Sequence, residues 1–324
     1  KEIKDENGIS YKIDTNTKTS SIFSFPNNQQ NILVPQNIKY NDTEYVITNI
    51  FNFTNEENDK IENLNFCENS FLINLSYMSF AGFSIEHISI PPTVTTIGEK
   101  AFFECVHLKS IEIPVNSKLK FIEKFAFYES LIEFLFVPAD FIEFKEYWCI
   151  GTKFLKRIIV SPENHNFKFT ENNLLLGKSD TKSDNFDVII FGSREIENIK
   201  IPSDIKLIGS GAFSECNKLK NIEITSNSKL EKIEKSAFKN SLIESLFVPS
   251  CFCEFESNWC VGVEFLTNIK ISPENSNFKF TEDHLLLGKS DSKSDNFDVV
   301  HFGSRNIETI KIPSNIKQIN ASAF

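Results

Sequence analysis

Few residues of this chain have the types and spacing that catalysis or phosphate binding requires. Gly177-Lys178-Ser179 resembles the end of a phosphate-binding loop, but Asn172 stands where that loop needs its first glycine. No Gly-x-Ser-x-Gly segment occurs, so the turn that exposes the nucleophilic serine of an α/β-hydrolase is not encoded. Both observations argue against an enzyme and against a nucleotide cofactor.

Metal-ligating side chains are equally dispersed. Cys251-x-Cys253 is tighter than the usual zinc-site spacing, and no second pair completes it. Two polar loops could bind calcium, but they lack the glycine and glutamate of an EF-hand, so we favour solvated acidic loops. Their aspartates are Asp180, Asp184, Asp187, Asp291, Asp295 and Asp298. The histidines without metal-binding spacing are His87, His107, His165, His284 and His301. We therefore predict no catalytic residue, no cofactor and no metal site.

Charge and hydropathy narrow the class of partner. The 324 residues include 34 Lys and Arg against 44 Asp and Glu, which gives a net charge of −10. A nucleic acid would be repelled, so we predict a protein partner. No apolar run approaches the ~18 residues of a membrane-spanning helix, so no direct membrane span is expected in this chain.

The cysteines and asparagines bear on the cellular compartment. The seven cysteines are an odd number in a large chain, which argues against a small disulfide framework and favours buried thiols that fill small apolar spaces. Four N-glycosylation sequons are compatible with secretion. They lie at Asn41, Asn52, Asn74 and Asn320.

An internal repeat dominates the sequence. Residues 90–200 realign with residues 201–311 at a constant offset of 111 without a gap, and a third copy begins at residue 312. Trp148-Cys149, for example, matches Trp259-Cys260. Such a repeat is typical of a solenoid, in which each unit buries its apolar side chains against its neighbours.

A shorter period of about 23 residues lies inside each copy. Its pattern is apolar-x-x-apolar-x-apolar, as in Leu108/Ile111/Ile113, and the last positions alternate as in a strand with one buried face. A second signature follows in many units, as in Ile97-x-x-x-Ala101-Phe102. We interpret most of the 33 Phe residues as a core spine between successive coils. Roughly 23 residues per coil fits the leucine-rich-repeat size class.

The repeats predict the domain organisation. Residues 1–60 are expected to form an N-terminal β-hairpin cap with a degenerate first coil at Leu33-Val34, and residues 61–324 a solenoid. The cap strands are expected at Gly8–Asp14, Ser20–Phe25 and Glu44–Ile50. Two longer intervals, one in each copy, are expected to be inserted β-hairpin units, which gives about ten coils in addition to the cap and the insertions.

The repeat resembles the BspA-like leucine-rich repeat family. The resemblance rests on Ile90-Pro91…Ile97-Gly98…Ala101-Phe102…Cys105…Leu108…Ile111-Glu112-Ile113-Pro114, and on its second copy. It implies a curved, β-rich leucine-rich-repeat solenoid with irregular or short helical return segments. It also implies a surface antigen that adheres to host cells or matrix proteins, which places the protein at the cell surface or outside the cell. An intracellular scaffold in a cytoskeletal or regulatory assembly is the alternative.

The best candidates for partner contact are the outward positions of the strands. The residue between the last two buried positions of each strand should face solvent. These residues are Ser89, Glu112, Phe136, Ile159, Lys200, Glu223, Phe247, Lys270 and Lys311. Phe136, Ile159 and Phe247 are apolar, which predicts a protein-binding patch, unless the inserted hairpins cover them.

Overall fold

The computed structural model of the chain describes residues 1–51, 60–305 and 307–324. It is a β-solenoid of about 13 turns, and none of the described residues is in a helix. The chain divides into two compact units, Lys1–Asn166 and Phe167–Phe324. The expected leucine-rich-repeat solenoid is confirmed, and its return segments are turns and two-residue strands instead of helices.

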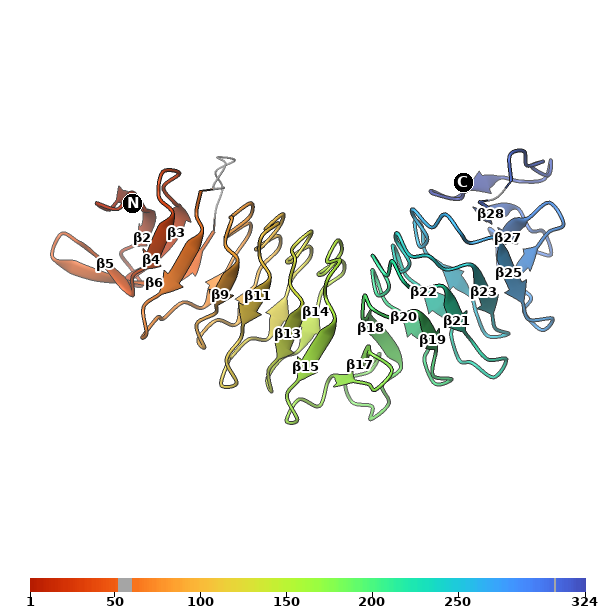
Figure 1. Ribbon diagram of the computed structural model, residues 1–324, viewed down its shortest axis with the longest axis horizontal. Coiled ribbons are helices and arrows are strands. Elements are labelled where there is room, and N and C mark those ends of the chain that lie inside the picture. The colour runs from red at the N-terminus through yellow and green to blue at the C-terminus, as the bar shows by residue number, and fades with distance from the viewer. Residues whose placement is uncertain (52–59, 306) are drawn as a thin grey trace. The chain divides into compact units, whose positions relative to one another are not determined.

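Each coil of the first unit contributes one short strand to a surface that we call its ribbon, in which the strands pair two by two. Its strands are β4 (Asn31–Val34), β7 (Asn63–Phe66), β9 (His87–Ser89), β11 (Ser110–Glu112), β13 (Phe134–Val137) and β15 (Arg157–Val160). Figure 1 shows β9, β11, β13 and β15 side by side. Their pairing is parallel, because each coil enters the ribbon in the same direction.

A second sheet of the first unit starts antiparallel and becomes parallel. Its strands are β1 (Glu2–Lys4), β2 (Ser10–Asp14), β3 (Thr19–Ser24), β5 (Asn37–Tyr40), β6 (Thr43–Ile50), β8 (Asn74–Leu75), β10 (Thr96–Ile97), β12 (Phe121–Ile122) and β14 (Glu143–Phe144). The strands expected at the N-terminus are present as β2, β3 and β6, and β4 pairs with β7 as a first coil would. From β6 onward, each coil adds one strand in parallel.

The second unit repeats this arrangement. Its ribbon holds β19 (Asn198–Lys200), β21 (Asn221–Glu223), β23 (Ser245–Val248) and β25 (Asn268–Ile271). The remaining strands are β16 (Lys168–Phe169), β17 (Leu174–Gly177), β18 (Val188–Gly192), β20 (Leu207–Ile208), β22 (Lys232–Ile233), β24 (Glu254–Phe255), β26 (Phe278–Phe280), β27 (Leu285–Gly288), β28 (Val299–Gly303) and β29 (Gln318–Ile319). The inserted segments form antiparallel strands, and their last strands, β18 and β28, pair in parallel with β20 and β29. The first insertion therefore belongs to a six-stranded sheet with β20, β22 and β24, and the second forms a four-stranded sheet with β29.

The Ala-Phe signature forms a turn that bonds one coil to the next. In the coil of Ala101-Phe102, the backbone N–H groups of Lys100, Phe102 and Glu104 donate to the carbonyls of residues 124, 126 and 128 of the next coil at 2.8–3.0 Å. Lys100 and Glu104 have φ of 58° and 55°, so each turn has two left-handed residues four positions apart. The turn places the alanine and phenylalanine inward, where both are fully buried.

The phenylalanines of these turns form the core spine. Phe102 lies with its ring centroid 5.4 Å from those of Phe80 and Phe127, and the Phe102 and Phe127 rings are stacked. In the second unit, Phe213 and Phe238 stack at the same 5.4 Å. Some phenylalanines lie outside the spine and are about half exposed: Phe71, Phe134, Phe154, Phe265 and Phe324.

One aspartate of each polar loop is buried, although the other four aspartates are exposed as expected of solvated acidic loops. The Asp187 carboxylate accepts bonds from the Ser179 N–H (2.8 Å) and hydroxyl (2.7 Å) and pairs with Lys206 at 3.3 Å. Burial favours the neutral acid, but the Ser179 and Lys206 contacts outweigh it and lower the pKa of Asp187. Asp298 is held in the same way by Ser290 and Lys317. The serine contact joins the two ends of each polar loop, and the lysine contact attaches the loop to the coil that follows.

Replacing this anchor is expected to loosen the loop. Asp187→Asn removes the charge that Ser179 and Lys206 stabilise, so the free energy of unfolding should fall by about 1–3 kcal/mol at pH 7. Because the folded-state pKa is lowered, this contribution is present above the unfolded-state pKa of about 4 and fades as the pH falls below it. Urea unfolding at pH 7 and pH 3 measures both effects. Asp184→Asn, at an exposed position of the same loop, is the control, and an equal loss in both variants would contradict the anchor.

Candidate binding surface

The ribbon presents alternate residues to solvent, as the strand pattern predicts. Of the nine positions named from the sequence, seven are exposed: Ser89, Glu112, Ile159, Lys200, Glu223, Lys270 and Lys311. Phe136 and Phe247 are half-buried, and Phe247 packs partly against the core of the second unit. The outward side of the ribbon is therefore a mostly polar surface interrupted by a few apolar side chains.

An apolar patch lies over β13 and β15 of the first unit, and we define it by Phe134, Phe136 and Ile159. Phe136 and Ile159 are directly opposite each other in the parallel ladder, and Phe134 is two residues before Phe136 on the same face. Phe134 is 49% exposed and Ile159 is 47% exposed. Their binding role stays a prediction, but they meet its first requirement.

Arg157 adds a charge to the patch. It is the ladder partner of Phe134, and its side chain is exposed. Among the described residues, the Arg157 guanidinium forms neither an ion pair nor a hydrogen bond, whereas the neighbouring Lys156 pairs with Glu133 at 2.9 Å. The patch therefore combines apolar side chains with one cation that is available to a partner.

The sequence pattern missed Phe134 and Arg157, because it followed only the outward position between the last two buried residues. Both ribbon strands here are four residues long, so their first residues share the outward face with Phe136 and Ile159. The second unit has no equivalent of the patch. Its residues at the positions of Phe134, Arg157 and Ile159 are Ser245, Asn268 and Lys270.

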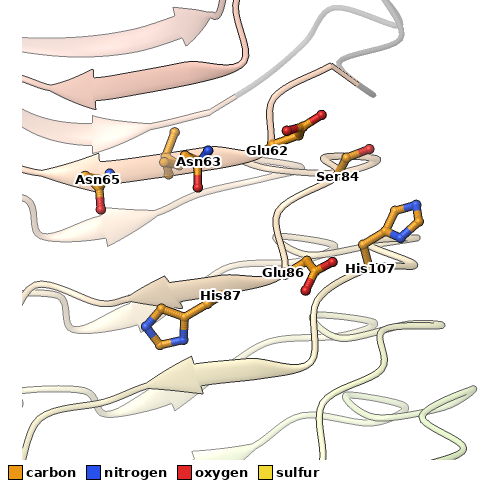
Figure 2. A pocket seen from close by; sticks show the side chains of 8 residues that line it. Glu62, Asn63, Asn65, Ser84, Glu86, His87 and His107 are labelled. Atoms are coloured by element: carbon orange, nitrogen blue, oxygen red, sulfur yellow. The ribbon is translucent and has the colours of Figure 1, made fainter.

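A polar hollow of about 560 Å³ lies between β7 and β9, where the ribbon ladder is interrupted. In Figure 2, Asn63 projects from β7 and His87 from β9, while Glu62 and His107 lie on the segments that enter the strands. Four lining residues are already engaged. Glu86 pairs with Lys109 at 3.0 Å and His87 bonds Ser110 at 2.7 Å. Glu62 accepts a bond from Gln30, and Asn63 donates to Asn31 at 2.8 Å. The hollow offers polar contacts but no apolar anchor.

The described residues contain no group of three His, Cys, Asp or Glu side chains that could hold a metal ion. All seven cysteines are free thiols, and four are buried as expected: Cys105, Cys149, Cys216 and Cys260. Cys251 and Cys253 are exposed, contrary to the expectation of buried fillers. The pKa of both thiols is raised, first because the sulfur atoms are partly desolvated and then because the Glu231 carboxylate is nearby. Both thiols are therefore poor nucleophiles at neutral pH.

The four sequons lie in different settings. Asn41 is exposed in the turn between β5 and β6, where a glycan would meet no obstacle on the turn itself. Asn74 is partly buried in β8, and its amide donates to the Asn49 side chain at 2.8 Å. The Asn320 side chain contacts the His301 ring at 3.0 Å. Asn52 lies outside the described residues.

The stacked coils and the ribbon define the class: a leucine-rich repeat protein, with a fold of the protein-interaction type. A family model for the BspA type leucine-rich repeat region matches six copies over residues 73–172, 186–285 and 291–324. The chain therefore belongs to the BspA-type leucine-rich repeat family. No long apolar helix that could cross a membrane occurs among the described residues.

Solved structures share the fold. The pneumococcal vaccine antigen PcpA is 19% identical with a TM-score of 0.67, over 100% of this chain and 94% of that one. A leucine-rich repeat protein from Eubacterium ventriosum is 17% identical with a TM-score of 0.57, over 83% and 71%. One from Bacteroides ovatus is 21% identical with a TM-score of 0.55, over 83% and 66%. A comparison with curated protein sequences finds no match. At these identities, the similarity to the solved structures establishes the shared fold.

Proposed function

We propose that this chain is a non-catalytic adhesin module, displayed at the cell surface or secreted, that binds a host-cell or extracellular-matrix protein through the apolar patch. The observation that carries the proposal is the exposure of Phe134 and Ile159 on a ribbon whose other outward residues are mostly polar. Exposed aromatic and aliphatic side chains on a rigid strand surface are the usual anchors of protein interfaces. The antigen relative adds support for the surface setting.

The patch also indicates the chemistry of the partner. An apolar side chain would cover Phe134, Phe136 and Ile159, and a neighbouring carboxylate would pair with the Arg157 guanidinium. Arg is enriched at interface centres because its planar group binds a carboxylate through two hydrogen bonds. The partner surface that fits is therefore apolar with an acidic residue at its border.

The second repeat supplies the substitutions that test the patch. Phe134→Ser with Ile159→Lys introduces the residue types that the second repeat has at the equivalent positions, Ser245 and Lys270. The fold therefore already accepts them there. We expect unchanged folding and a loss of binding of about 30- to 100-fold, because each side chain is a candidate anchor. Binding of the native chain and of the variant to host cells and to immobilised matrix proteins measures the effect.

Ser245→Phe with Lys270→Ile is the matched control, because it builds a similar apolar surface on the second ribbon without touching the patch. The control variant should bind at least as well as the native chain. Undiminished binding by the patch variant would show that another surface makes the contact.

An intracellular scaffold role is the second candidate, and the free, exposed Cys251 and Cys253 favour it, because unpaired surface thiols persist in a reducing compartment. The state of the native protein separates the two candidates. A glycan on the exposed Asn41 supports the surface role, whereas an unmodified Asn41 together with reduced thiols supports the scaffold.

A further inference from the structure

The turns of the first unit carry a cluster of partly exposed aromatic residues that the patch does not use. We call it the aromatic edge and define it by Phe103, Phe125, Tyr128 and Tyr147. The Phe103 and Tyr128 rings are stacked at 4.7 Å and the Phe125 and Tyr147 rings at 5.3 Å, while Phe125 and Tyr128 meet edge to face at 6.1 Å. The four rings thus form one continuous surface over three successive coils.

Carboxylates border the aromatic edge. Glu104 and Glu129 directly follow Phe103 and Tyr128, and both are exposed. In the part of the chain that the structure describes, neither carboxylate has an ion pair or a hydrogen bond. A cation already lies over the edge, because the Lys100 Nζ is 5.5 Å from the Phe103 ring centroid. The edge therefore already holds one cation by a cation–π contact and has negative charge left over.

Folding alone does not require these residues. The second repeat has the same turns with Ser214, Ser236, Lys239 and Asn258 in place of the four rings, and Asn240 in place of Glu129. Phe125 and Tyr147 have φ of 56° and 62°, a left-handed conformation that a bulky residue adopts at a cost and that asparagine tolerates well. The first unit thus keeps aromatic rings where the equivalent turns use small or polar residues.

We propose that the aromatic edge is a second binding surface, which takes an arginine-rich protein segment. Arginine fits both features, because its guanidinium stacks on aromatic rings and also pairs with carboxylates. The stacked pairs would hold the guanidinium groups of an extended segment, and Glu104 and Glu129 would pair with them at the border. This surface is separate from the apolar patch, whose own free charge is a cation.

A short basic peptide tests the proposal directly. We would titrate an acetylated and amidated (Gly-Arg)4 peptide into the full chain by calorimetry at low salt, with (Gly-Glu)4 as the peptide control. Phe103→Ser with Phe125→Ser leaves the charge unchanged and should weaken binding about tenfold through the loss of two cation–π contacts. Glu104→Gln with Glu129→Gln keeps the rings and alters only exposed side chains, so it tests the carboxylates even if the ring variant folds poorly. It should weaken binding at least fivefold.

Two control variants separate this surface from general attraction by the acidic chain. Glu197→Lys changes the net charge by two units at an exposed position just before β19 of the second unit. Phe134→Ser with Ile159→Lys removes the apolar patch. Both should retain peptide binding within about twofold. The proposal is overturned if the edge variants bind (Gly-Arg)4 like the native chain or if (Gly-Glu)4 binds equally well. Self-association of the native chain that the edge variants lose would also overturn it, because the occupant would then be a second copy.

Discussion

Phe102→Ala is expected to lower the free energy of unfolding of the first unit by about 3–5 kcal/mol. Phe102 is fully buried and lies 5.4 Å from the rings of both Phe80 and Phe127, so its removal leaves a cavity between three coils. Chemical denaturation measures the loss. Because repeats couple mainly to their neighbours, hydrogen exchange should quicken first at amides of adjacent coils.

Phe154→Ala is the matched control for this prediction, because Phe154 belongs to the same unit but is 51% exposed. Its truncation should cost less than about 1 kcal/mol. If both variants lose the same stability, or if exchange quickens uniformly along the unit, the stacked spine does not carry the cooperativity assigned to it here.

His301→Ile is expected to remove most of the acid sensitivity of the second unit between pH 6.5 and pH 4. The His301 ring lies against Phe278 (5.3 Å) and Phe255 (6.2 Å), and burial there lowers its pKa to about 4. The unfolded chain binds the proton near pH 6.5 and the folded chain only near pH 4, so falling pH destabilises the fold through this window. The loss should reach about 2–3 kcal/mol at pH 4.

The first repeat shows that isoleucine fits at this position, because Ile190 occupies it there. Urea unfolding at pH 7, 6, 5 and 4 should show a steeper loss for the native chain than for His301→Ile. Carboxylates such as Asp187 and Asp298 contribute below about pH 4 in both proteins, so the difference between the two curves isolates the histidine. His284→Asn is the control, because the equivalent residue of the first repeat is the exposed Asn173. This variant should retain the native dependence of stability on pH. Parallel curves for the native chain and His301→Ile would refute the assignment.

Much of the coil could be predicted because its determinants are local. Alternation in Ile88-Ser89-Ile90 fixes which strand residues face inward, and the strand β9 forms there. The fixed distance from this strand to Ala101-Phe102 predicts a turn that returns the chain to the core. The two-residue strands β10 and β12 could not be located, since each exists only through hydrogen bonds to the neighbouring coil.

The surfaces could be predicted only in part. Phe136 and Ile159 break the polar pattern of outward positions, and that departure is visible in the sequence. Phe134 was missed because its strand extends one residue further than the repeat pattern requires. Asp187 looked like a solvated loop residue, because the bonds that bury it come from Ser179 and from Lys206, which is 19 positions later in the chain. Such pairings depend on how coils stack.

The one-to-one correspondence of the two repeats has a consequence for how this protein can change. Phe134 and Ser245 differ, while the buried Leu135 and Leu246 beside them are the same. Alternate residues of each strand therefore form the surface and the core. The outward-facing residues of each repeat could therefore change during evolution, and new partners could be acquired, without substitutions in the core. Duplication of one copy would even provide a spare surface on which such variation is harmless.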